Sequence, residues 1–450
     1  MNSRNTVTGK FVASMMLALG TSTVAHAHAG LPETSNVTVR RGHPADFFVG
    51  ATFGAVISRD SGQTWRWICD QAMGYGGWRP ESFLWREAGD IIAATGSAIL
   101  RSPDGGCSWN THPYFAGNWV AALAAHPTDD RILYAITGRT GLTNGVYRSQ
   151  DGGETWEPTS LLRLGPVFNA IRVSPVDPRR LYVSGEEAGR MLLFRSDDAG
   201  ATWQEHAHTL PELTRPYDLV VTAADPASVD AVWVRVASQG YTHLMRSEDG
   251  GRTLTPVHAL DDVFINMELS ADGGTVWVGT LNFFFRGPRA GPLEKQPLPT
   301  GNACVLRTGN TLYACGSTWL HDWALARSPD QGTTWEPLFT LYGIQGTHHC
   351  PAGTPVRKLC PALWPTLADQ LGADPYPDGG VEEPPPPPPP PVDAGTPDAG
   401  PQQPDVPDAG GTPPAGKSDG CGAASGNAVP ALVFLSTLTL WRRGRRRSDA

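Results

Sequence analysis

Two short segments combine aromatic side chains with polar groups that could recognise a ligand. Residues 319–323 supply Trp319, His321, Asp322 and Trp323, and residues 73–79 supply Tyr75, Trp78 and Arg79. Rings offer stacking area and a few polar groups fix orientation, which is what a pocket for a sugar or a peptide requires. The same rings could instead seal a junction between structural units, and the residues alone leave both interpretations open.

Carboxylates are a second source of chemistry. Glycoside hydrolysis needs two of them, one acting as acid and the other as base or nucleophile, at a separation that sets the stereochemistry. The candidates are Asp70, Glu81, Glu186, Glu187, Asp218, Asp261 and Asp322. No motif selects a pair among them, so the catalytic residues stay unknown.

The sequence predicts no cofactor and no metal. Residues 74–77 are rich in glycine, but the strand and helix that must flank a nucleotide-binding loop are not expected there. His348 and His349 stand beside Cys350 and are interpreted as loop residues rather than metal ligands.

One repeat, Ser-x-Asp-x-Gly-x-Thr-Trp, sets the organisation of the chain. Four full copies begin at Ser58, Ser149, Ser196 and Ser328, and copies with one change begin at Ser102 and Ser247. Successive copies are separated by 44, 47, 47, 51 and 81 residues. The last interval is close to two periods, and residues 285–288 at its middle match an eroded copy. A fixed period of this size indicates a repeat architecture with seven units.

The residue types of the repeat suit a tight turn followed by a strand. Ser and Asp side chains accept hydrogen bonds from nearby backbone N–H groups, and Trp begins the next strand as a large apolar wedge. We expect this structural role for Ser58, Asp60, Trp65, Asp104, Trp109, Asp151, Trp156, Asp198, Trp203, Asp249, Asp330 and Trp335.

Short β-rich segments precede each repeat, such as residues 131–136 followed by residues 145–148. Each unit is therefore interpreted as four antiparallel strands with the repeat on the third turn, which is one propeller blade. The predicted fold is all-β, a seven-bladed β-propeller over residues 30–345.

These motifs resemble the BNR/Asp-box repeat superfamily over about residues 35–342. Its members include sialidases, xyloglucanase-type glucanases, the sortilin ectodomain and photosystem II assembly factors, so the resemblance implies a propeller and leaves the activity open. It also implies a ligand face opposite the Asp-box turns, formed by the loops that leave each fourth strand and those that join strands two and three. On that face we expect ligand-binding roles for Tyr75, Trp78, Arg79, Trp119, Asp218, Trp319, His321, Asp322 and Trp323.

Two departures from the superfamily argue against an enzyme. The Phe/Tyr-Arg-Ile-Pro motif of sialidases is absent from the sequence. Xyloglucanase-type enzymes carry two propellers around a cleft, whereas this chain has repeats for one.

The N-terminus predicts export. Residues 1–29 contain Arg4 and Lys10, an apolar run over residues 11–25, and Ala25-His26-Ala27 as a cleavage site, which together form a signal peptide. Export permits disulfides, and six of the seven cysteines lie in the folded region. We expect Cys304–Cys315 across a hairpin that turns at Gly309-Asn310, Cys350–Cys360 closing a flap over residues 346–372, and Cys69–Cys107 by elimination.

The C-terminal part predicts a stalk and an anchor. Residues 373–419 are rich in proline, with eight in succession at 384–391, and form an extended linker. Residues 420–450 contain Cys421, an apolar run over residues 428–441 and an arginine cluster. This order resembles the MYXO-CTERM sorting signal, which implies processing near Cys421 and display at the cell surface. An ordinary tail anchor is the alternative, and it also leaves the protein attached to a membrane.

The formal net charge of −9, with no basic stripe, argues against a nucleic-acid partner. We therefore expect an exported, monomeric propeller at the cell surface or outer membrane that binds an extracellular glycan or a surface protein. The alternative is a glycoside hydrolase, xyloglucanase-like or sialidase-like, that acts on extracellular polysaccharide.

Overall fold

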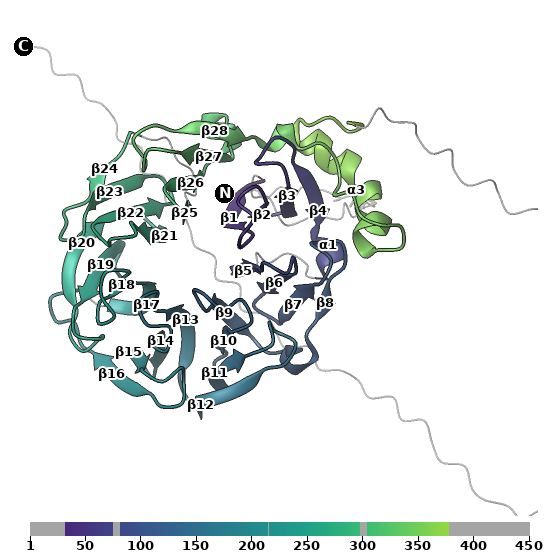
Figure 1. Ribbon diagram of the computed structural model, residues 1–450. Coiled ribbons are helices and arrows are strands. Elements are labelled where there is room, and N and C mark those ends of the chain that lie inside the picture. The colour runs from purple at the N-terminus through teal and green to yellow at the C-terminus, as the bar shows by residue number, and fades with distance from the viewer. Residues whose placement is uncertain (1–31, 75–81, 215, 298–303, 378–450) are drawn as a thin grey trace, which may run out of the picture. The chain divides into compact units, whose positions relative to one another are not determined.

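The computed structural model describes residues 32–74, 82–214, 216–297 and 304–377. All of them belong to the first of two units of the chain, residues 1–382. They form seven four-stranded antiparallel sheets arranged as blades around an axis, as Figure 1 shows. The predicted seven-bladed all-β propeller is confirmed.

The strands follow one another in chain order within each blade. Blade 1 contains β1 (Thr34–Val39), β2 (Phe47–Ala51), β3 (Gly54–Ser58) and β4 (Arg66–Cys69). Blade 2 contains β5 (Ser82–Trp85), β6 (Ile91–Ala94), β7 (Ile99–Ser102) and β8 (Asn110–Thr111). Blade 3 contains β9 (Val120–Ala125), β10 (Leu133–Thr137), β11 (Thr143–Ser149) and β12 (Glu157–Leu164). Blade 4 contains β13 (Val167–Val173), β14 (Leu181–Glu187), β15 (Arg190–Ser196) and β16 (Gln204–His208).

The remaining three blades follow the same pattern. Blade 5 contains β17 (Pro216–Ala224), β18 (Val232–Ser238), β19 (Tyr241–Ser247) and β20 (Thr255–Leu260). Blade 6 contains β21 (Phe264–Leu269), β22 (Thr275–Thr280), β23 (Phe284–Pro288) and β24 (Glu294–Lys295). Blade 7 contains β25 (Val305–Thr308), β26 (Thr311–Cys315), β27 (Leu325–Ser328) and β28 (Glu336–Phe339). The short helices are α1 (Asp70–Met73), α2 (Thr318–His321), η1 (Pro113–Phe115) and η2 (Leu341–Gly343), and the one long helix is α3 (Pro355–Leu371).

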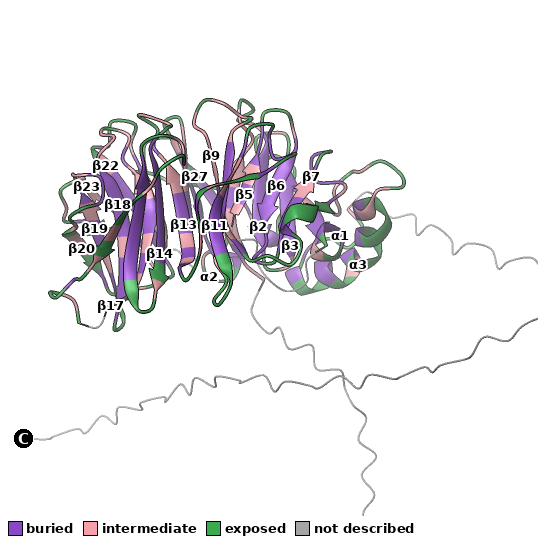
Figure 2. Cartoon of the chain, turned by 90° about the horizontal axis from the view of Figure 1, so that it is seen from below, coloured by how far each residue is buried: buried purple, intermediate pink, exposed green. Residues whose placement is uncertain are grey.

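The first strand of every blade lies nearest the axis and the fourth lies outermost (Figure 1). Because consecutive strands are antiparallel, the turns after the first and third strands lie at one end of the propeller and the remaining loops at the other. The inner and middle strands are mostly buried, and exposed residues gather in the connecting loops and on the outer strands (Figure 2). Fully buried rings such as Trp233 and Trp277 fill the space between blades.

The ring closes without exchange of strands between the first and last blades. Blade 1 and blade 7 meet through β1, which packs against β25 and β26. Two aromatic pairs cross this junction: Phe47 with Tyr313, at 5.1 Å between ring centroids, and Trp65 with Phe339, at 4.5 Å. Blade 1 therefore joins blade 7 through side-chain packing.

A segment that we call the strap, residues 341–377, crosses this junction and covers the outer edge of blade 1 (Figure 1). Gln345 N–H donates to Trp65 O at 2.9 Å and His348 N–H donates to Trp67 O at 2.7 Å, so the strap pairs with β4. Helix α3 then packs on α1 and β4, with Val356, Trp364 and Leu371 buried in the same core as blade 1. Pairing of this kind removes an exposed strand edge.

The disulfides differ in part from the prediction. Cys304–Cys315 is confirmed, with a Cα–Cα distance of 4.8 Å. The pairs Cys350–Cys360 and Cys69–Cys107 are wrong, because the structure joins Cys69 to Cys360 and Cys107 to Cys350. The strap is therefore bonded to blades 1 and 2 rather than to itself.

None of the described helices has the length and apolar character needed to cross a bilayer. The signal peptide, most of the proline-rich linker and the C-terminal anchor, with Cys421, lie outside the described residues.

Candidate functional site

The Asp boxes connect the third and fourth strands, where the repeat predicts them. In six blades the Ser hydroxyl donates to the Asp Oδ1 at 2.8 to 3.0 Å. In blade 3, Asp151 also accepts from the N–H groups of Glu154 and Thr155 and from the Thr155 hydroxyl at 2.5 Å. Burial alone would raise the pKa of Asp151, but these hydrogen bonds lower it to about 2. The carboxylate therefore accepts hydrogen bonds from groups of its own turn.

The box tryptophans act as wedges to different degrees. Trp65, Trp109 and Trp156 are buried, and each donates its ring N–H to the carbonyl of the box glycine, as Trp156 Nε1 does to Gly153 O at 3.2 Å. Trp203 and Trp335 are only partly buried.

Residues 319–323 lie between β26 and β27, on the end opposite the Asp boxes. Trp319 is 37% exposed and its Nε1 donates to Pro32 O at 2.9 Å. Asp322 caps α2 with φ of 66° and accepts from the Tyr342 hydroxyl at 2.5 Å. Trp323 is 5% exposed and stacks over Gly316, where an added Cβ would come within 2.3 Å of the ring. Trp323 thus packs inside blade 7, and Trp319 is the tryptophan of this segment that faces solvent.

The loops of blades 2 and 3 form a second exposed aromatic group at the same end. Trp119 is 38% exposed and lies over Gly96, whose φ is +74° and whose added Cβ would meet the ring at 3.2 Å. Tyr114, on the same loop, is 47% exposed and packs edge-on against Phe115. The glycine thus leaves room for a large ring against the loop of blade 2.

The other predicted ligand-binding residues differ in their surroundings, and some of them lie outside the described residues. Asp218, on the inner strand β17, is paired with Arg235 Nη1 at 2.9 Å and accepts from Asn169 Nδ2 at 3.2 Å. His321 is partly exposed at the end of α2. Tyr75, Trp78 and Arg79 lie outside the described residues, as does Glu81.

Among the candidate carboxylates, Asp70 is the first residue of α1, and burial raises its pKa. Glu187 is held by Arg190 at 2.6 Å and Arg163 at 3.3 Å, and the Glu186 carboxylate accepts from Gly189 N–H at 3.2 Å. A raised pKa suits a general acid, so among the described candidates the environment of Asp70 fits that role.

Large exposed apolar side chains are concentrated at the end opposite the Asp boxes. On the loops and strand ends there, the structure exposes Tyr114, Trp119, Leu142, Leu164, Tyr241, Val263, Leu281, Trp319, Leu320 and Tyr342. On the described turns of the Asp-box end, only Val176 is exposed to the same degree. We call these ten side chains and their loops the apolar face. The repeat pattern indicated the position of this face, but it did not indicate Leu142 or Leu281.

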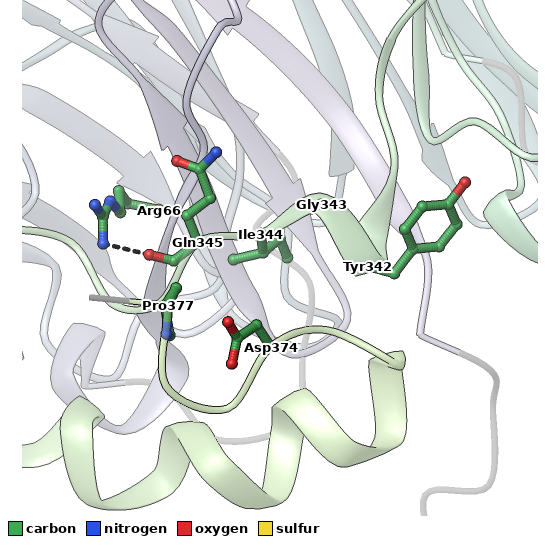
Figure 3. Close-up of a pocket in the computed structure, with 7 residues that line it drawn as sticks. All are labelled: Arg66, Tyr342, Gly343, Ile344, Gln345, Asp374 and Pro377. Carbon is green, nitrogen blue, oxygen red and sulfur yellow. Dashed lines mark hydrogen bonds between the residues drawn. The ribbon is translucent and has the colours of Figure 1, made fainter. Parts of the chain in front are cut away.

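A pocket of about 370 Å³ lies beside the strap (Figure 3). Arg66 donates to the Gln345 carbonyl on one side, and Asp374 lies on the other (Figure 3). The Tyr342 ring points away from its centre (Figure 3). No pattern in the sequence indicated this pocket, because residues distant in the chain form it.

Cys107, His348 and Cys350 bring their ligand atoms within 4.8 Å of one another. The two sulfurs form a disulfide and so offer no thiolate to a metal. Burial lowers the pKa of His348 to about 4. The described geometry is that of a packed disulfide beside a neutral imidazole.

Comparisons with known proteins match the Asp-box repeat and, over part of the chain, two xyloglucanases. The family model for the BNR/Asp-box repeat matches residues 147–158, the box of blade 3. A xyloglucanase of Paenibacillus is 26% identical over 326 residues, covering 59% of this chain and 29% of the enzyme. An oligoxyloglucan-reducing end-specific xyloglucanase of Emericella nidulans is 31% identical over 284 residues, covering 59% of this chain and 31% of the enzyme.

Among solved structures, YCF48 from Cyanidioschyzon merolae is 11% identical, with a TM-score of 0.45, and the match covers 67% of this chain and 97% of that one. The chain spans about three tenths of the length of the two xyloglucanases. With its seven blades and the box geometry, the chain is a β-propeller built on BNR/Asp-box repeats.

Proposed function

We propose that this chain is an exported, surface-anchored propeller that binds an extracellular polysaccharide on its apolar face. The observation that carries the proposal is the asymmetry between the two ends of the propeller. Exposed rings and aliphatic side chains gather at the end opposite the Asp boxes, whereas the described turns of the other end expose mainly polar groups. Exposed apolar side chains gathered on one side of a soluble protein are a mark of a binding surface.

The chemistry of the apolar face suits a sugar chain. Trp119 and Trp319 each leave more than a third of their surface open, and both are held in position, one over Gly96 and the other by a hydrogen bond to Pro32. Fixed rings stack on sugar faces without a large loss of side-chain entropy. The exposed Arg139 lies on the loop next to Trp119 and supplies hydrogen-bond donors.

The similarity to xyloglucanases favours a glycan over a polypeptide as the ligand. Those two relatives are named for action on xyloglucan, a polysaccharide. We therefore propose a β-glucan-type polysaccharide as the first ligand to test, with a surface protein as the alternative.

Binding of the full chain to immobilised xyloglucan, compared with unrelated polysaccharides, tests the proposal. Trp119→Ala is expected to weaken binding at least about tenfold, which corresponds to about 1.4 kcal/mol. Tyr376→Ala is the matched control, since this ring is 57% exposed but follows α3 on the strap. Equal affinity of wild type and Trp119→Ala for every glycan, or no glycan binding at all, would overturn the proposal.

A glycoside hydrolase is the second candidate, favoured by the raised pKa of Asp70 and by the xyloglucanase relatives. Incubation of the full chain with xyloglucan and detection of new reducing ends tests it. Activity that Asp70→Asn abolishes, with binding retained, would favour the hydrolase. Binding without any release of reducing ends would leave the chain a binding protein.

A further inference from the structure

The disulfide that joins the strap to blade 2 lies beside a histidine. One ligand atom from each of Cys107, His348 and Cys350 lies within 4.8 Å of the other two. Tetrahedral zinc holds sulfur at about 2.3 Å and nitrogen at about 2.0 Å, which places its ligand atoms about 3.5–3.8 Å apart. The three side chains are therefore close enough to share one metal ion after small shifts, once the two sulfurs are no longer bonded to each other.

Backbone hydrogen bonds hold this cluster independently of the disulfide. Cys107 lies in the Asp-box turn of blade 2, where its N–H donates to Asp104 Oδ1 at 3.1 Å. Its carbonyl accepts from Val356 N–H of α3 at 3.3 Å, and His348 N–H donates to Trp67 O at 2.7 Å. Opening the Sγ–Sγ bond thus leaves the box turn and the strap in register with each other.

A second disulfide keeps the strap tethered. Cys69–Cys360 joins β4 to α3, and both of its cysteines are fully buried. Of the six cysteines among the described residues, Cys350 is the one that is partly exposed, whereas the other five are at most 3% exposed. Because a thiol must reach a sulfur to break a disulfide, Cys107–Cys350 is the bond that a reductant opens first.

We propose that reduction of Cys107–Cys350 creates a zinc site, with Cys107, His348 and Cys350 as the protein ligands. Two thiolates and an imidazole are a ligand set that Zn²⁺ prefers, and three protein ligands leave the fourth position to water. The bound ion then links the strap to blade 2 in place of the disulfide. This site goes beyond the proposed glycan binding, because it lies in the Asp-box turn of blade 2 and not on the apolar face.

The reductant is a dithiol, either a small molecule or a protein. Its thiolate attacks Cys350 Sγ, and the bond to Cys107 Sγ breaks, which leaves Cys107 as a thiol. The second thiol of the reductant then displaces Cys350 and closes a disulfide within the reductant. Two electrons have passed to the two cysteines. When zinc binds, both thiols give their protons to the solvent.

Reduction of the full chain without denaturant, followed by titration with Co²⁺ and then Zn²⁺, tests the site. We expect two new thiols, at Cys107 and Cys350 by peptide mapping, with an unchanged near-ultraviolet circular dichroism spectrum. One Co²⁺ per chain should then produce a thiolate-to-cobalt charge-transfer band, which Zn²⁺ removes. Zinc should also raise the Tm of the reduced chain. The oxidised chain, which retains Cys421, is the control and should show no such band.

Variants separate the three ligands from their surroundings. Cys350→Ser should abolish the two-thiolate spectrum, and His348→Ala should lower the affinity for zinc at least about tenfold, since even the partners of metal ligands contribute that much. His349→Ala is the matched control, because this adjacent histidine does not belong to the cluster. Replacement of the buried pair Cys304 and Cys315 by Ser should leave cobalt binding unchanged.

Three results would overturn the proposal. They are a reduced chain with free Cys107 and Cys350 that binds no Co²⁺, loss of the native spectrum on reduction, and zinc affinity of His348→Ala equal to that of the wild type. Reduction of another disulfide before Cys107–Cys350 would also contradict it. His348→Gln, which is closer in size to histidine, takes the place of His348→Ala if that variant fails to fold.

Discussion

At the scale of the residue, each Asp-box carboxylate stabilises its turn by accepting hydrogen bonds in its ionised form. The pKa of Asp151 is lowered to about 2 by hydrogen bonds from Thr155, Ser149 and Glu154 that outweigh its burial. A folded-state pKa below the unfolded value of about 4 means that Asp151 stabilises the fold fully above about pH 4 and loses this contribution as the pH falls toward 2. Asp151→Asn should therefore lower the Tm at pH 7 and have a much smaller effect near pH 2.

Thermal unfolding from about pH 2 to pH 7 measures this difference. Glu294→Gln, an exposed residue on the outer strand of blade 6, is the control and should leave the Tm nearly unchanged. A Tm difference for Asp151→Asn that is the same at both ends of the range would contradict the role of its charge.

Single residues also mark how far prediction from the sequence can go. The box residues were predictable because Ser149, Asp151 and Trp156 contact one another within one turn. The pocket beside the strap was not, because Arg66 and Asp374 are 308 positions apart in the chain and carry no motif. Trp323 was predictable only in part. The composition of residues 319–323 fits a pocket, but Trp323 itself is buried against Gly316.

At the scale of the element, the sequence patterns indicated a flap over residues 346–372 but missed its helix and its disulfide partners. Pro361 and Pro365 argue against a helix, because proline removes a backbone donor and clashes with the preceding turn. Yet Val356, Cys360, Trp364 and Leu371 recur at helical spacing and are buried against blade 1. The apolar period could have revealed α3, whereas its disulfide partners, which lie in blades 1 and 2, could not be deduced from spacing.

The disulfides of the strap are expected to stabilise the ring more than the hairpin disulfide does. Cys107–Cys350 spans 243 residues and Cys304–Cys315 spans 11, and a longer loop restricts the unfolded chain more strongly. Replacing Cys107 and Cys350 by Ser should cost about 2–4 kcal/mol and expose the strap to proteases. The same double replacement of Cys304 and Cys315 is the control and should cost less, as measured by denaturant unfolding. Peptide mapping of the unreduced protein that linked Cys350 to Cys360 would contradict the scheme.

At the scale of the whole molecule, the strap and the aromatic pairs explain how seven similar blades close into one ring. Most neighbouring blades follow one another in the chain. Blades 1 and 7 are distant in sequence, and they become neighbours only when the ring closes. Trp65 and Phe339 fill that junction, and the pairing of the strap with β4 spans it from outside. The period of the repeat predicted the number of blades. The way in which the ring closes could not be predicted, because it depends on contacts of blade 1 with blade 7 and with the strap.

The C-terminal part of the sequence predicts where the propeller resides. The described fold ends at residue 377, and the sequence from residue 378 to residue 417 is rich in proline, a composition that gives an extended spacer. Deleting residues 418–450 should therefore release the protein into the medium with an unchanged Tm, because the proline-rich spacer separates the deleted residues from the propeller in the sequence. Fractionation of cells and medium, with the intact chain as reference, measures the release. Cys421→Ala, which leaves the apolar run and the arginines in place, separates the two anchors: loss of surface display would favour processing near Cys421, and retention would favour a tail anchor. A truncated chain that stays with the membrane fraction would contradict an anchor in this segment.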